Sequence, residues 1–130
     1  MPAEENKELV RRYFAALSGK DKPAETVGKF VTDQELTQHI AAFEAAFPRY
    51  QLIADDIIAE GDRVAVRATF KGQHKGELMG MPPTGKAVSL PLIMIYRVAT
   101  GKIVQHWLSV DRLALMEQLG VASPTGPGAR

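Results

Sequence analysis

The chain has 130 residues, enough for one domain with a sizeable hydrophobic core, and no second domain is expected. Lys and Arg number 16 against 15 Asp and Glu, and no basic block alternates with aromatic residues, so nucleic acid is not an expected partner. Cysteine is absent, which excludes disulfides, thiol catalysis and cysteine metal ligands, while the lack of a signal-like start or a long apolar run predicts a cytoplasmic protein without a membrane partner.

Three helices are predicted in the first third of the chain. Over residues 4–18, apolar side chains recur at helical spacing between charged ones, which is the pattern of an amphipathic helix. A short helix over about 24–30 is expected next. Thr32 and Glu35 then have the spacing of a capping box, in which the hydroxyl and the carboxylate satisfy amides of the first turn. An apolar stripe after this box predicts a long helix that ends at Pro48.

A hairpin is predicted where helical spacing gives way to alternation. Residues 51–59 and 63–71 flank a Glu-Gly-Asp turn, which is typical of two antiparallel strands. Apolar residues of the second strand alternate with Arg, Thr and Lys, so one face is buried and the other is solvated. If the alternation continues without a bulge at Gly72, His74 lies on the apolar face beside Phe70.

A loop over residues 78–86 is predicted from its Gly and Pro content, and it carries Met79 and Met81. Flexible apolar side chains on a loop can close over a cavity. Residues 87–98 follow as a long and nearly continuous apolar strand, which indicates a central position in the sheet.

The run over residues 101–111 carries the only Trp of the chain and ends where a helical pattern begins. In a regular strand alternate side chains share a face, and one such row here combines apolar and polar groups. This mixture suits a cavity wall better than a sealed core. We therefore expect the row to line a cavity, and His106, on the opposite face, to lie on the outer sheet surface or in a dimer contact. The predicted cavity row is Ile103, Gln105, Trp107, Ser109 and Asp111.

The predicted order is helices first, then a meander of at least four strands, then a short helix over residues 112–119 that Gly120 ends. This order predicts an α+β fold with helices on one face of an antiparallel sheet. A strongly curved sheet around a long helix would leave a conical hollow between the two. One domain is expected over residues 1–122, followed by a loose tail rich in Pro and Gly over 123–130.

Several stretches carry a resemblance to a known family. They are residues 70–77 (FKGQHKGE) and 80–86 (GMPPTGK), followed by IYR at 95–97, GKI at 101–103, His106-Trp107, Asp111 and QLG at 118–120. Over residues 6–121 the chain resembles the SnoaL-like polyketide cyclase, or predicted ester cyclase, branch of the nuclear-transport-factor-2-like (NTF2-like) superfamily. The resemblance implies a cone-shaped α+β barrel, with a curved mixed or antiparallel sheet wrapped around N-terminal helices, and a homodimer formed through the outer sheet face.

The resemblance also implies residue roles. In the family's cyclases, an Asp in the position of Asp111 acts as acid and base in an intramolecular aldol closure. The family's His on the penultimate strand is Met94 here, and the acidic residue common just before Trp107 is Gln105. Since this fold hosts cyclases, isomerases, hydrolases and binding modules, the function has to be argued from the site.

Each polar candidate also has a structural interpretation. Asp111 directly precedes a helix, where Asp is a favoured N-cap, and capping would lower its pKa, whereas a base for neutral pH needs a raised one. His74 either relays a proton to a substrate or is a packed residue that satisfies a backbone group. His39 is expected to be an ordinary packing residue. Tyr13 resembles in position the tyrosine with which ketosteroid isomerases hold a dienolate oxygen.

We predict a cofactor-independent cyclase or isomerase that transfers protons on a small hydrophobic carbonyl compound. Asp111 would be the acid and base, His74 would polarise or relay, and Gln105 with Trp107 would position the substrate. No metal is expected, because the histidines lack ligand spacing, and no Gly-rich phosphate loop indicates a nucleotide. The alternative is a non-catalytic module that binds a hydrophobic ligand in the same hollow. The predicted lining is Phe43, Phe47, Met79, Met81 and Met94, with Tyr13.

Overall fold

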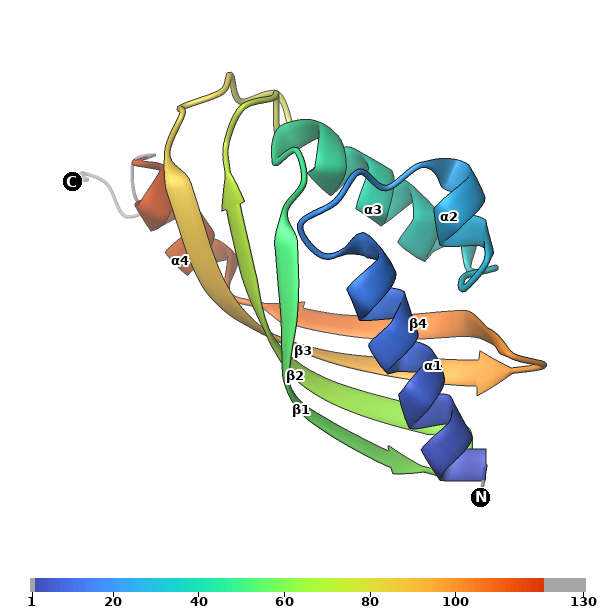
Figure 1. The fold of residues 1–130 in the computed structure, drawn as a ribbon. Coiled ribbons are helices and arrows are strands. Elements are labelled where there is room, and N and C mark those ends of the chain that lie inside the picture. Colours follow the sequence, from blue (N-terminus) through green and yellow to red (C-terminus); the bar gives the residue numbers. More distant parts are fainter. Residues whose placement is uncertain (1, 121–130) are drawn as a thin grey trace.

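The structure is a computed structural model and describes residues 2–120. Three helices, α1 (Pro2–Leu17), α2 (Ala24–Gly28) and α3 (Gln34–Ala46), are followed by four strands and a last helix (Figure 1). The strands are β1 (Gln51–Glu60), β2 (Arg63–Gln73), β3 (Ala87–Ala99) and β4 (Lys102–Val110), and the last helix is α4 (Arg112–Leu119). Every predicted helix and strand is therefore present close to its predicted bounds. The predicted tail over 123–130 and the domain end at 122 lie outside the described residues, so the domain extent stays a prediction.

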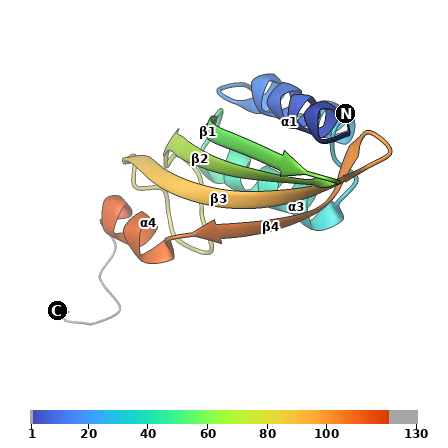
Figure 2. The same cartoon turned by 90° about the horizontal axis from the view of Figure 1, so that it is seen from below.

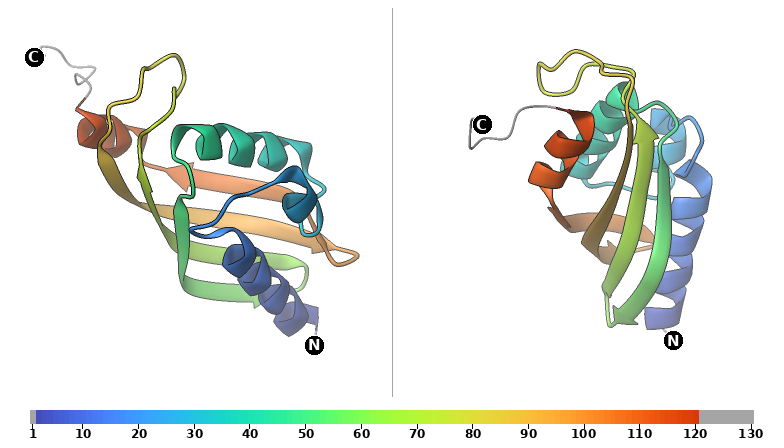
Figure 3. Two further views of the ribbon diagram at one scale, coloured as in Figure 1. Left: turned by 45° about the horizontal axis from the view of Figure 1, so that its top comes forward. Right: turned by 90° about the vertical axis from the view of Figure 1, so that its left-hand side faces the viewer.

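The strands form one curved antiparallel sheet in which neighbours in the chain are neighbours in the sheet (Figure 2). Helix α1 packs across β1 and β2, and α3 lies beside β4 (Figure 3). This arrangement confirms the predicted α+β class, with the N-terminal helices on one side of a curved sheet. Within residues 2–120, no helix is long and apolar enough to cross a membrane.

The core lies between the helices and the face of the sheet that they cover. Alternate residues of β2 and β3 are buried, and they meet in register, with Phe70 opposite Leu90 and Val66 opposite Met94. The pairing of β2 with β3 continues without a shift to the end of β2, so no bulge interrupts the alternation. His74 is fully buried, as the alternation predicts.

The start of β4 contains a bulge. Gln105 pairs with Arg97, but Ile103 already pairs with Val98, so Val104 is an extra residue in the strand. The N–H of Ile103 donates to Phe30 O at 2.7 Å, and its carbonyl accepts from Thr32 N at 3.0 Å. A bulge of one residue turns all following side chains to the opposite face.

The predicted cavity row of β4 is therefore wrong beyond Val104. Ile103 is fully buried, whereas Gln105 and Trp107 lie on the outer face, and Trp107 is 40% exposed. His106 lies opposite Trp107 as predicted, but it faces the helices and not the outer surface. The sequence pattern alone carries no sign of this bulge, which lies next to a backbone contact with a distant segment.

The segment between β2 and β3 is held in place by its backbone. His74 N donates to Lys86 O and Gly85 N donates to His74 O, both at 2.8 Å. The amides of Lys75 and Gly76 donate to Ala46 O at 2.9 and 3.0 Å, which satisfies a carbonyl group at the end of α3. The loop that carries Met79 is thereby attached to α3.

We predict that Gly76→Ala destabilises the fold, because an added Cβ would collide with the backbone carbonyl of Ala45. Overpacking of this kind lowers the free energy of unfolding by roughly 1–3 kcal/mol, which chemical denaturation would detect. Gly28→Ala is the matched control, since its added methyl group meets nothing within 4 Å. Equal stability of the two variants would contradict the prediction.

Candidate functional site

A cavity of about 230 Å³ lies between the curved sheet and the helices. Side chains from α1, α3, all four strands and α4 line it, together with Met79 from the loop. Most of these side chains are aliphatic or aromatic, which matches the apolar walls typical of small-molecule sites. The cavity has few polar groups, and these determine which hydrogen bonds and proton transfers it can support.

Four of the predicted lining residues line this cavity, namely Tyr13, Phe43, Met79 and Met94. Phe47 does not line it, because its ring is fully buried and stacks behind Phe43 with 6.0 Å between ring centroids. Met81 packs against the core from the loop, where its backbone pairs with Leu78. A role of any of these residues in substrate binding stays a prediction.

Gln105 and Trp107 do not line the cavity, because the bulge places them outside. Gln105 Oε1 accepts from Arg97 Nε at 3.2 Å. The guanidinium of Arg63 lies over the Trp107 ring, 4.9 Å from its centroid. This orientation is incompatible with the predicted task of positioning a substrate from the cavity wall.

The structure does not bring Asp111 and His74 together at the cavity. Asp111 is exposed and caps α4, with Oδ1 accepting from Ala114 N at 2.9 Å. His74 is buried in the loop anchor, where its Nδ1 accepts from Thr84 N at 3.1 Å. Neither belongs to the residues found to line the cavity within 2–120. Both positions fit the structural interpretations, and the catalytic roles of these two residues stay predictions.

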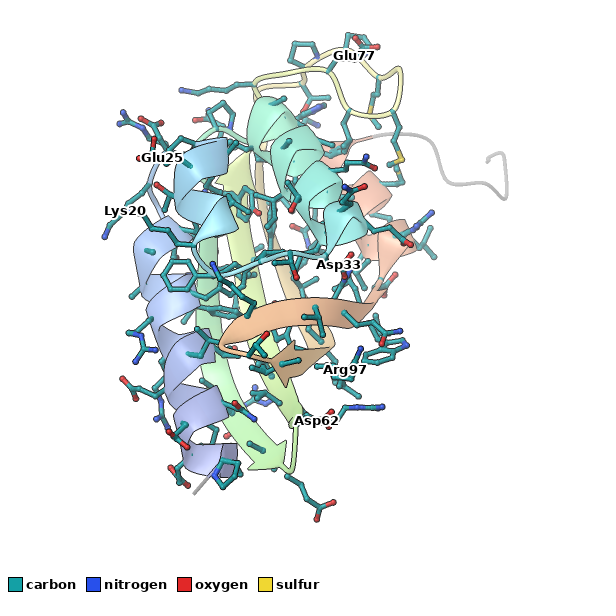
Figure 4. The ribbon with its side chains drawn as sticks, turned by 90° about the vertical axis from the view of Figure 1, so that its right-hand side faces the viewer. Lys20, Glu25, Asp33, Asp62, Glu77 and Arg97 are labelled. Carbon is teal, nitrogen blue, oxygen red and sulfur yellow. The ribbon has the colours of Figure 1, made fainter. Side chains whose placement is uncertain are left out.

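His106 faces the cavity and is held by Asp33. Asp33 is the N-cap of α3, and its Oδ1 accepts from the amides of Glu35 and Leu36 at 3.0 and 3.3 Å. Its Oδ2 lies 2.7 Å from His106 Nδ1, and the two side chains are only 13% and 15% exposed. Figure 4 shows Asp33 between α3 and β4, whereas Arg97 lies on the other side of the sheet.

The protonation of this pair follows from its hydrogen bonds. Partial burial raises the pKa of Asp33, but hydrogen bonds from His106 and from the amides of Leu36 and Glu35 outweigh burial, so the net pKa lies below its usual value. An ionised carboxylate can only accept hydrogen bonds, so His106 Nδ1 carries a proton. In the neutral form of this imidazole, the other ring nitrogen, Nε2, has the free lone pair. The pair therefore presents a base at the cavity wall.

His39 and Arg112 add two further basic side chains to the cavity. The His39 ring lies against Phe43, with 4.5 Å between ring centroids. Burial first, and then repulsion from His106 and Arg112, lowers the pKa of His39. The lowered pKa favours the neutral imidazole, and the contact with Phe43 fits the expected packing role of His39. Its place at the cavity also allows it to form hydrogen bonds there.

The three tyrosines of the chain also line the cavity. Tyr96 pairs with His106 across β3 and β4, and its ring lies edge to face with that of Tyr13 at 5.8 Å. Burial, the largest cause, raises the pKa of Tyr13, Tyr50 and Tyr96. They remain neutral phenols, and the Tyr96 hydroxyl donates to Met94 Sδ at 3.0 Å.

Sequence reasoning missed His106, Asp33, His39 and Arg112 as site residues. The capping box assigned the N-cap to Thr32, whereas Asp33 is the cap. The one usable signal was an Asp before a long helix, since capping occupies one carboxylate oxygen and leaves the other for a partner. Over residues 2–120, no group of three or more His, Asp or Glu side chains could hold a metal ion.

The sequence resembles characterised cyclases over part of its length. The aklanonic acid methyl ester cyclase DnrD of Streptomyces peucetius is 39% identical over 70 residues, which are 54% of this chain and 48% of that protein. The chain thus spans about half the length of the curated relatives it matches.

Solved structures share the fold over almost the whole chain. AclR of Streptomyces galilaeus, described as a candidate hydroxylase, is 31% identical with a TM-score of 0.77, over 91% of this chain and 82% of that chain. A protein of ketosteroid isomerase-like fold from Catenulispora acidiphila has a TM-score of 0.71 at 17% identity, over 92% and 98% of the two chains. These neighbours confirm the predicted NTF2-like architecture. The family model described as SnoaL-like polyketide cyclase matches residues 7–119, and the chain therefore belongs to the SnoaL-like polyketide cyclase family.

Proposed function

We propose that this protein is a cofactor-independent acid–base catalyst that closes a ring, or shifts a proton, on a small hydrophobic carbonyl compound. The observation that carries the proposal is the hydrogen bond between Asp33 and His106 at the wall of an apolar cavity. A carboxylate that orients an imidazole beside a substrate space is a recurring arrangement for a general base.

In this proposal Nε2 of His106 takes a proton from the carbon next to a substrate carbonyl. The neutral phenol of Tyr13 donates a hydrogen bond to the enolate oxygen that forms, and that of Tyr96 can join it by turning from Met94 Sδ. The enolate carbon then attacks a second carbonyl of the same molecule, a carbon–carbon bond forms, and the new alkoxide takes the proton back from the imidazolium. Atoms and electrons balance without an oxidant or a cofactor. The apolar walls strengthen each polar contact, because little water competes for it.

We predict that His106→Gln lowers the rate of α-proton exchange roughly 10²- to 10⁴-fold, because the general base is removed. The rate can be followed by NMR in heavy water with a panel of ketone esters and ketone carboxylates of one to three rings. Asp111→Asn is the comparison, since Asn also caps helices and Asp111 does not line the cavity. Loss of exchange in the Asp111 variant and not in the His106 variant would return the catalytic role to Asp111.

The variant Asp33→Asn tests whether Asp33 orients His106 or only caps α3. The amide can still accept from the amides of Glu35 and Leu36, but it carries no charge and can donate to Nδ1, which favours the wrong imidazole tautomer. We expect exchange to fall by at least about tenfold, with the melting temperature close to that of Asp111→Asn, the matched N-cap variant. A change in melting temperature without a change in rate would assign Asp33 a structural role alone.

The non-catalytic alternative is favoured by one observation, the use of Asp111 as a helix cap. A binding module with this cavity would hold a hydrophobic ligand and show no exchange in any variant. The exchange measurement therefore separates the two functions. A cytoplasmic location stays a prediction.

We further propose that the outer sheet face pairs with a second copy of the chain. Ile93, Ile95 and Trp107 lie there with exposed fractions of 55%, 37% and 40%, and Ile95 is the cross-strand partner of Trp107. The N-terminal helices lie on the opposite side of the sheet (Figure 3). Adjacent exposed apolar side chains of this kind are typical of an interaction surface.

Ile93→Glu is expected to convert a dimer into a monomer, because it would bury a charge against its own copy. Sedimentation velocity measures the change, and Leu113→Glu on α4, another exposed apolar position at 47%, serves as the control. A wild-type monomer, or a dimer that survives Ile93→Glu, would contradict the proposed face.

A further inference from the structure

The cavity is lined by basic side chains and by no carboxylate of the described residues. His39, His106 and Arg112 line it, and no Asp or Glu of the described range does. Asp33 lies behind His106, and Asp111 is engaged as the cap of α4. Arg112 gives this apolar space a positive charge with no carboxylate on the same walls, which favours an anion, because low polarity strengthens the attraction.

Arg112 is the only one of the three that is charged at every physiological pH. It is the first residue of α4, and it is exposed while still lining the cavity. Among the described residues, no Asp or Glu forms an ion pair with it. Its planar guanidinium is therefore available, and its geometry matches the two oxygens of a carboxylate. His39, which lines the same cavity, can supply a further N–H.

The cavity size limits the rest of the ligand. A cavity of about 150 Å³ is enough for benzene, and pockets for drug-sized ligands are about 300–1,000 Å³. The value of about 230 Å³ lies between these limits. It corresponds to about one ring with a few substituents inside the cavity.

We propose that the substrate is a carbonyl compound of about one ring that carries a free carboxylate, and that Arg112 and His39 bind this carboxylate at the cavity. The inference rests on the proposed function, and it goes further in naming the class of substrate. It separates this chain from relatives that are named as cyclases of methyl esters, since a methyl ester has no negative charge for Arg112 to bind.

Binding of para-acetylbenzoate and of its methyl ester to the full-length protein, measured by calorimetry at neutral pH, tests the proposal. The pair differs in charge and little in size. We expect the acid to bind at least about tenfold more tightly, because a charge-assisted hydrogen bond is lost in the ester. Arg112→Gln should reduce the acid to the affinity of the ester. Arg97→Gln is the matched control, because Arg97 bonds to Gln105 on the outer face.

Several results would overturn the proposal. These are equal affinities of acid and ester, a preference that survives Arg112→Gln, an absence of binding for both compounds at millimolar concentration, or equally tight binding of an anthraquinone carboxylate with three fused rings.

Circular dichroism establishes that each variant is folded. His106→Gln should keep the preference for the acid, since binding needs no proton transfer. A failed exchange experiment and a failed binding experiment are therefore distinguishable.

Discussion

The site depends on one backbone contact, the pairing of Ile103 with the segment that precedes α3. Ile103 uses both of its backbone groups on Phe30 and Thr32, and next to this contact Val104 bulges out of the pairing of β4 with β3. The bulge turns His106 toward the cavity. The same contact brings the start of α3 next to β4, so that Asp33, the residue after Thr32, reaches the imidazole.

Asp33 therefore has two tasks that support one another. Its Oδ1 satisfies amides at the start of α3, where the helix dipole also stabilises a negative charge. The resulting low pKa keeps the carboxylate ionised, which is the state that holds a proton on Nδ1 of His106. A helix cap is present whether or not a ligand is bound, so the orientation of the imidazole requires no rearrangement during a reaction.

Most of the architecture could be predicted from the sequence, because the helices and β2 follow regular periods. The inner face of β2 and the burial of His74 were predicted correctly, since no bulge interrupts that strand. The orientation of β4 could not be predicted, because periodicity does not report a bulge, and this one lies next to a contact between residues more than seventy positions apart. The same error placed Trp107 and Gln105 in the predicted cavity and left His106 out of it. Periodicity also cannot separate Phe43, which lines the cavity, from Phe47, which packs behind it.

The bulge determines which side chains lie on each face of β4. Because side chains alternate, His106 lies between Gln105 and Trp107 in the chain, and each of these neighbours faces outward. Inside, Asp33 holds the imidazole; outside, Arg63 lies over the indole of Trp107. A second copy packed on Trp107 would cover the strand from outside and restrict its motion at the residue that faces the substrate space. Assembly and site geometry would then depend on the same three consecutive residues, and a loss of the outer contact would reach the imidazole through the backbone of a single strand.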